Sequence, residues 1–323
     1  MNRKSGLDIY RILCCIGVLG YHVLDDVHPF EGETMILYYA CSFCVPGFFM
    51  LSGYLLGCRP ILSVEYSEKK IISVIKKLFG WVIFWVIVHF VRTGELYDVW
   101  TNMSQTITAS GIEPVAWFLC TYCLLMVVAP ALHYGMKKSP IIFYIVIVLW
   151  LWVLATGKLD FIREVRPQSL WLHLYAGYFA IGMVCADIYI RMSDFQKKIS
   201  WLAAIVIAVV SSFVYYREVF IDMNGLAPHQ NYGAWYYSLW LISLFVLISN
   251  YDVKNEIIQR ILKRISKNTF TVYLGHLPLL LFITSAKSLN SLGTAIVYII
   301  ILFVITLVMA EVFNRLPLLR KIT

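Results

Sequence analysis

Long apolar stretches follow one another along this chain and constrain its fold more than any other feature. Ten can be identified, separated by short polar segments, over residues 7–24, 34–57, 78–91, 114–134, 139–157, 169–190, 199–216, 232–249, 268–286 and 291–312. A helix needs about 20 mostly apolar residues to cross a bilayer. Only helices and closed barrels satisfy their backbone polar groups in lipid, and barrel strands alternate in polarity whereas these stretches do not. The sequence therefore predicts an all-α, polytopic membrane helical bundle with about ten transmembrane helices.

The composition excludes several other classes of protein. Of the 323 residues, 60% are hydrophobic and only 14% are charged, whereas soluble domains average roughly 25% charged residues. Because the deficit extends along the whole chain, the sequence does not suit a disordered protein, a secreted disulfide scaffold or an ordinary cytosolic enzyme. No loop is long enough for an independent domain, so residues 1–323 are predicted to form a single membrane-embedded domain.

The basic residues predict an orientation for the bundle. If the N-terminus is cytoplasmic, twenty of the 27 Lys and Arg residues lie in inner segments, six lie in outer segments, and Arg11 lies within a span. This split follows the positive-inside rule and places both termini in the cytoplasm. It also explains the net charge of +8, so a nucleic-acid partner is not expected. The amphipathic segment 254–268 is predicted to lie on the inner membrane surface.

Ionisable residues inside the predicted spans are the first candidates for function, because they are costly in lipid. Arg11 and His22 lie eleven residues apart in the first span, which places them within about 20° of each other on one helical face and about 16 Å apart along it. Each also has a simpler interpretation, Arg11 as an anchor that reaches the headgroups and His22 as a locally hydrogen-bonded residue at the helix end. Their shared face favours a joint function.

Further candidates lie near His22 and in the ninth apolar stretch. Asp25 and Asp26 follow His22 by three and four residues, and either carboxylate could orient the imidazole if the helix continues that far. His276 lies in the middle of a span, where it needs either a hydrogen-bonding partner between helices or a wet cavity. The eight cysteines include two C-x-x-C spacings, but these lie in apolar stretches where Cys acts as a small hydrophobic residue, and no metal site is predicted.

Four stretches of the sequence form a set. They are Arg11-x10-His22 after Leu7-Asp8, the FF-x-L-S-G-Y block at 48–54, the W-F-L element at 117–119 with Tyr122 and Pro130 after it, and the Y-L-x-H element at 273–276 after Ser266-Lys267-Asn268. In these stretches the sequence resembles the acyltransferase-3 family of ten-span membrane acyltransferases. Together they cover almost the whole chain. The inner segment EKKIISVIKKLFGW (68–81) departs from the family pattern, because it carries lysines and no proline where an Arg-rich stretch followed by Pro is common.

The resemblance implies a bacterial inner-membrane O-acyltransferase that moves an acetyl or other acyl group from cytoplasmic acyl-CoA to a hydroxyl of a surface or exported polysaccharide. His22 would be the general base, with Asp25 or Asp26 orienting it. The implied donor-binding residues are Arg11, Lys69, Lys70, Lys76, Lys77, Tyr273 and His276. Ser52, Glu113 and Trp117 are the candidate residues for binding the acceptor. The implied partners are acetyl-CoA as donor substrate, a glycan or lipid-linked glycan, and membrane lipid.

One alternative comes from a different class of protein. The membrane half of vancomycin-type serine racemases resembles the same family and is associated with serine supply. If this chain is such a half, it is an amino-acid transporter-like domain of a larger protein. Transporters often carry inverted repeats, and the absence of a recognisable repeat favours the enzyme. The sequence does not indicate the identity of the acceptor or the oligomeric state.

Overall fold

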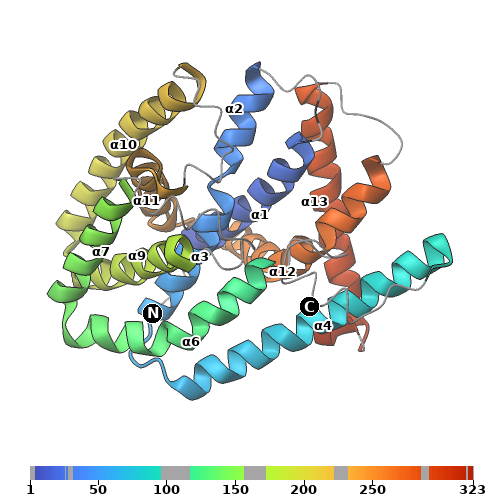
Figure 1. Ribbon diagram of the computed structural model, residues 1–323, viewed down its shortest axis with the longest axis horizontal. Helices are drawn as coiled ribbons and strands as arrows, with labels where there is room; N and C mark the ends of the chain where they lie inside the picture. Colours follow the sequence, from blue (N-terminus) through green and yellow to red (C-terminus); the bar gives the residue numbers. More distant parts are fainter. Residues whose placement is uncertain are drawn as a thin grey trace.

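A computed structural model describes residues 4–25, 27, 32–95, 117–155, 172–221, 232–284, 291–317 and 319–322. Over these residues the protein is all-helical and contains no β-strand, as predicted (Figure 1). The α-helices are α1 (Ser5–Asp25), α2 (Gly32–Cys41), α3 (Cys44–Gly57), α4 (Val64–Thr93), α6 (Trp117–Lys138), α7 (Pro140–Ala155), α9 (Leu172–Arg191), α10 (Asp194–Tyr216), α11 (Trp235–Ser249), α12 (Glu256–Thr284) and α13 (Leu292–Arg315).

Six helical segments of the described chain are long and apolar enough to cross a membrane. They are Ser5–Asp25, Gly32–Gly57, Val64–Val91, Trp117–Lys138, Asp194–Ile221 and Leu292–Arg315. Two shorter apolar helices, Pro140–Val153 and Trp235–Ser249, accompany them. The structure thus confirms a helical protein with several membrane spans. The number ten and the cytoplasmic position of both termini stay predictions.

The helices differ from the predicted apolar stretches in three places. The stretch 34–57 is broken between α2 and α3, because the ring of Pro46 in the first turn of α3 excludes a helical carbonyl at Ser42. Helix α4 begins at Val64, well before the apolar stretch that starts at residue 78, and Ser63 caps it by accepting a hydrogen bond from the Tyr66 amide at 3.1 Å. The amphipathic surface segment and the ninth stretch form one continuous helix, α12.

Helix α1 occupies the centre of the bundle and packs against α2, α3, α11, α12 and α13. The most extensive helix–helix contact is between α3 and α9. There a Cβ atom on Gly53 would overlap the Phe179 carbonyl, and one on Gly182 would overlap the Met50 carbonyl. Small residues such as Gly53 and Gly182 let the two helices approach this closely.

Helix α4 lies at the edge of the molecule, along the lower side of Figure 1, where it packs against α6. Its apolar half is fixed by Trp81, whose indole donates a hydrogen bond to the Ile322 carbonyl at 2.8 Å and whose ring lies 5.7 Å from that of Phe313. We call the end of the bundle where α1, α4 and α12 begin the basic end. This packing holds the first turns of α4 beside α1 and α12 at the basic end.

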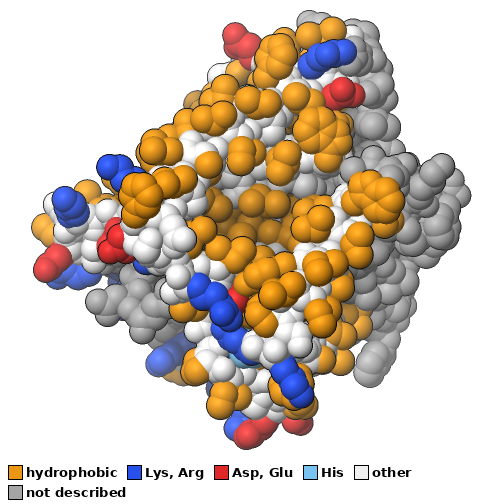
Figure 2. Space-filling model, turned by 90° about the vertical axis from the view of Figure 1, so that its left-hand side faces the viewer, with side chains coloured by type: hydrophobic (Ala, Val, Ile, Leu, Met, Phe, Trp, Pro, Cys, Tyr) orange, Lys and Arg blue, Asp and Glu red, His pale blue; other side chains and the backbone are white. Residues whose placement is uncertain are grey.

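The outer surface of the bundle is apolar, as contact with lipid requires. Figure 2 shows a face on which hydrophobic side chains surround a hollow and basic side chains gather at its lower rim. Helices α7 and α10 lie on this side of the molecule and carry many exposed apolar residues, among them Ile141, Ile145, Leu149, Trp152, Leu202, Val206, Val209 and Phe213. A surface of this kind would aggregate in water, so it fits a membrane protein.

Candidate functional site

A cavity of about 450 Å³ lies at the basic end between α1, α4 and α12, with α3 and α6 closing it. Its size is in the range of small-molecule sites, about 300–1,000 Å³. Four cationic side chains line it, and none of the described lining residues is acidic. The cations are Arg11, Lys70, Lys77 and Lys267; hydroxyls of Ser52, Tyr66, Ser73, Ser266, Thr269 and Tyr273 accompany them.

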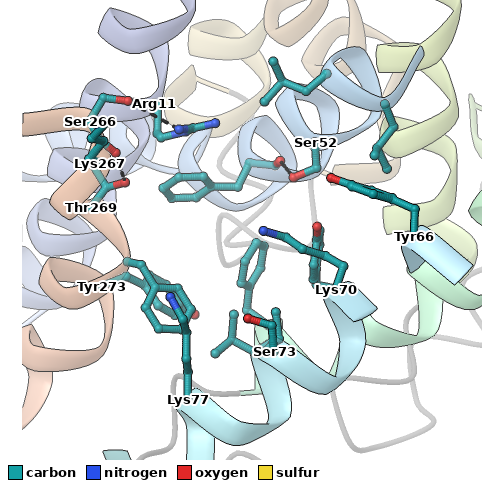
Figure 3. A pocket seen from close by; sticks show the side chains of 18 residues that line it. Arg11, Ser52, Tyr66, Lys70, Ser73, Lys77, Ser266, Lys267, Thr269 and Tyr273 are labelled. Carbon is teal, nitrogen blue, oxygen red and sulfur yellow. Dashed lines mark hydrogen bonds between the residues drawn. The ribbon is translucent and has the colours of Figure 1, made fainter. Parts of the chain in front are cut away.

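Helix periodicity explains which lysines of α4 reach the cavity. Lys70 and Lys77 are seven residues apart, within about 20° of each other around the helix, and both line the cavity together with Ser73. In Figure 3 the Lys70 ammonium points into the space between the three helices. Lys69 and Lys76 have the same spacing but lie on the exposed face, and Lys69 forms an ion pair with Glu65 at 2.6 Å.

Arg11 enters the cavity from α1, opposite the lysines of α4 (Figure 3). Its guanidinium donates a hydrogen bond to the Ser266 hydroxyl on α12 at 3.4 Å. Ser266 is 1% exposed, so Arg11 is held against a buried wall. A guanidinium keeps its charge and offers several donors in a fixed plane, which suits a phosphate or carboxylate group.

Helices α1 and α12 run side by side in the same direction. Arg11 contacts Ser266, the Cys15 thiol lies 3.7 Å from the Thr269 carbonyl, and the ring of His22 lies 5.3 Å from that of His276. Contacts from Arg11 and His22 to the same neighbouring helix confirm that the two residues share one face of α1. His276 is 0% exposed and His22 is half-buried, so the pair lies where the inside of the bundle meets its surface.

Tyr273 connects the cavity to the histidine pair. Its side chain lines the cavity, and its ring lies 5.4 Å from Phe118 and 5.9 Å from His276. The cavity wall is therefore one side chain away from His276 and two away from His22. The cation-lined cavity and the two imidazoles form one continuous arrangement along the α1–α12 contact.

Tyrosines surround the other side of His22. The Tyr21 ring lies 5.9 Å from His22 and stacks on Tyr38 at 4.5 Å. The Tyr38 hydroxyl donates a hydrogen bond to the exposed Asp25 carboxylate at 3.2 Å. The hydrogen bond that the structure shows for the Asp25 side chain is thus with Tyr38. The imidazole packed beside His22 is that of His276.

The predicted site residues fall into separate groups. Arg11, Ser52, Lys70, Lys77 and Tyr273 meet in the cavity, although Ser52 was predicted to bind the acceptor. Its hydroxyl also donates to the Phe48 carbonyl at 2.8 Å. The remaining predicted residues lie elsewhere: Lys69 and Lys76 on the exposed face of α4, Trp117 against Tyr175 with ring centroids 5.5 Å apart, and Asp26 and Glu113 outside the described residues.

Several cavity residues were not predicted from the sequence. Tyr66, Ser73 and Thr269 line the cavity, and no property of these residues alone distinguishes them from other polar residues of the chain. Tyr122, Ser266 and Lys267 also line it and could have been found, because they belong to stretches that carry the family resemblance. The chemistry that the whole lining favours is the binding of an anion with hydroxyl-bearing or amide-bearing portions.

The eight cysteines are free thiols. Among the described residues, no group of three or more His, Cys, Asp or Glu side chains is arranged to hold a metal ion. The two histidines contact each other and tyrosines, with no third ligand-type side chain at metal-binding distance in the described set. The two imidazoles are groups that can take up and release a proton.

The described helices thus form an apolar bundle with a cationic cavity one side chain away from a pair of histidines. A family model described as an acyltransferase domain matches residues 4–314, nearly the whole chain. The chain belongs to the acyltransferase-3 family. No curated protein and no solved structure matches it. Family and apolar helices together indicate a membrane acyltransferase.

Proposed function

We propose that this protein transfers an acyl group, acetyl by default in the family, from cytoplasmic acyl-CoA to a hydroxyl of a surface or exported polysaccharide. The bacterial inner membrane is the proposed location, with the basic end facing the cytoplasm. The observation that carries the proposal is the convergence of Arg11, Lys70 and Lys77 on one cavity whose wall residue Tyr273 adjoins the histidine pair. A donor whose anionic group binds the cations and whose reactive group reaches the histidine pair matches this arrangement.

The cavity provides the binding part of this function. CoA carries phosphates at one end and a thioester at the other, joined by the long pantetheine arm. The phosphates bind near the four cations, where charge-assisted hydrogen bonds are strong. The hydroxyls of the lining suit the amides of the arm. From Arg11 to His22 the distance is about 16 Å along α1, a length that the extended arm can largely span.

His22 provides the chemical part. Its ring nitrogen takes the proton from the acceptor hydroxyl as the oxygen attacks the thioester carbonyl carbon. The C–S bond breaks, the CoA thiolate leaves, and the proton passes from His22 to the sulfur. The new C–O and S–H bonds replace the C–S and O–H bonds that break, and the imidazole returns to its neutral form. The donor approaches from the basic end and the acceptor from the tyrosine side, so the two substrates meet at the histidine layer.

The first experiment measures binding and turnover of radiolabelled acetyl-CoA by the purified protein, with Arg11→Ala and His22→Ala beside the wild type. We expect saturable binding that weakens by about 10- to 100-fold in Arg11→Ala, and slow release of free CoA that is lost in His22→Ala. Lys69→Gln is the matched control, because this lysine is on the exposed face of α4. A well-folded wild-type protein that binds no acetyl-CoA would overturn the proposal, and serine uptake into proteoliposomes would then be measured.

A further inference from the structure

In the part of the chain that the structure describes, His276 has a hydrogen-bond partner for one ring nitrogen and none for the other. Its Nδ1 lies 2.5 Å from the Tyr273 carbonyl oxygen of its own helix. A carbonyl oxygen can only accept, so in this bond Nδ1 carries the proton. Nε2, separated from Nδ1 by one ring carbon, has no hydrogen-bond partner among the described residues, although it is buried and the residue is 0% exposed. In the neutral imidazole the protonated Nδ1 leaves Nε2 as an acceptor.

An unsatisfied buried acceptor is costly, by about 1–3 kcal/mol, and such groups in native proteins need an explanation. The neighbouring imidazole is that of His22, with the ring centroids 5.3 Å apart and the planes at 38°. At this separation a small adjustment of either ring brings a His22 N–H to the lone pair of His276. Asp25, the other candidate for orienting His22, accepts a hydrogen bond from Tyr38.

We infer that His276 is a positioning residue whose Nε2 lone pair accepts a hydrogen bond from the His22 ring and so fixes the tautomer of His22. This inference rests on the proposed acyltransferase function. With one His22 nitrogen donating to His276, the other nitrogen carries the lone pair that takes the proton of the acceptor hydroxyl. When that proton arrives, the bond to His276 persists and stabilises the imidazolium. The Tyr273 carbonyl is thus the fixed end of a chain that runs through His276 to His22.

Two substitutions separate the two nitrogens of His276. His276→Gln places an amide oxygen near the position of Nε2 and can still accept from His22. His276→Asn places an amide near the position of Nδ1, keeps the bond to the Tyr273 carbonyl and leaves the Nε2 position empty. We expect His276→Gln to retain kcat within about tenfold and His276→Asn to lose about 100-fold in kcat, the scale of a misplaced catalytic group. Acetyl-CoA binding should be the same in both variants, because the cavity is unchanged.

The outcomes are decisive in each direction. Equal losses in the Gln and Asn variants, as large as in His22→Ala, would make His276 a base itself and overturn the inference. Full activity in both variants would remove any role for it. Retained acetyl-CoA binding and an unchanged melting temperature in detergent show that a variant is folded. If the wild type itself neither binds nor turns over acetyl-CoA, the proposed function has failed instead.

A second measurement does not depend on activity. Nitrogen NMR of histidine-labelled protein distinguishes protonated from unprotonated ring nitrogens. We expect His276, assigned by the loss of its signals in His276→Gln, to be protonated at Nδ1 only. We also expect the His22 signals to change in His276→Asn. A His276 protonated at Nε2, or a His22 spectrum that His276→Asn leaves unchanged, would contradict the inference whatever the substrate is.

Discussion

The two ends of the α1–α12 contact are built in different ways. At the Arg11 end, four cations and several hydroxyls surround an open cavity. At the His22 end, the rings of Tyr21 and Tyr38 and the buried imidazole of His276 pack closely. The described contacts of these rings with one another and with His22 involve no Lys or Arg side chain. Charge in an accessible cavity attracts and holds an anion, whereas a dry, packed environment fixes geometry and strengthens electrostatic interactions. The difference suggests that binding and chemistry are divided between the two ends.

The sharpest test of this division, and the largest expected effect, is His22→Ala. We expect turnover to fall by about 10²- to 10⁴-fold, the range that general base catalysis contributes. The dissociation constant for acetyl-CoA should stay within about twofold, because His22 is not among the residues that line the cavity. The measurements are CoA release by a thiol assay and equilibrium binding on one preparation. A His22→Ala protein that turns over at the wild-type rate would contradict both the division of binding and chemistry between the two ends and the proposed mechanism.

Arg11→Ala should produce the opposite pattern. We expect acetyl-CoA binding to weaken by about 10- to 100-fold, the cost of losing charge-assisted hydrogen bonds. Turnover at saturating donor should change little. The control is acetyl-pantetheine, a donor without the nucleotide phosphates. Its KM should be nearly unaffected by Arg11→Ala, while its turnover should still be lost in His22→Ala. Equal sensitivity of both donors to Arg11→Ala would show that Arg11 does not bind the phosphates.

The two faces of α4 give a matched pair for a smaller effect. We expect Lys70→Gln/Lys77→Gln to raise the KM for acetyl-CoA by about tenfold, because both side chains line the cavity. Lys69→Gln/Lys76→Gln removes the same charge from the exposed face, and we expect a change under about twofold. Steady-state kinetics at fixed ionic strength compares them. Similar effects from both pairs would mean that the lysines act only through the general field of the surface.

The sequence predicted the framework of this site better than its details. Apolar stretches and intramembrane charges identified a helical membrane protein, and the eleven-residue spacing placed Arg11 and His22 on one face, which the contacts to α12 confirm. The four lysines could not be divided into two pairs, because the division depends on where α4 begins and which side packs against α1 and α12. For the same reason the sequence did not show that Ser52 faces this cavity, and its predicted role in binding the acceptor stays a prediction.

The contact between His22 and His276 was also beyond the sequence. The two residues are 254 positions apart, and no spacing rule brings separate helices into register. His276 was a candidate because an imidazole in a span needs a partner and because it ends the Y-L-x-H element of the family resemblance. Only the structure shows that Nδ1 of His276 bonds to the Tyr273 carbonyl and that Nε2 has no partner among the described residues. The position of His276 within a span made it a candidate, and the tertiary structure identifies His22 as its neighbour.

The smallest expected effect concerns Asp25, which the sequence offered as the residue that orients His22. In the structure Asp25 is exposed and accepts a hydrogen bond from Tyr38, and an exposed carboxylate is strongly screened by solvent. We therefore expect Asp25→Asn to lower turnover by less than about threefold, while His276→Asn has the much larger effect given above. Tyr38→Phe is the matched control, because it removes the other partner of the same hydrogen bond. If Asp25→Asn instead reduces turnover as strongly as His22→Ala with Tyr38→Phe near wild type, the carboxylate orients the imidazole directly. The histidine layer would then be organised from its exposed side rather than from within the bundle.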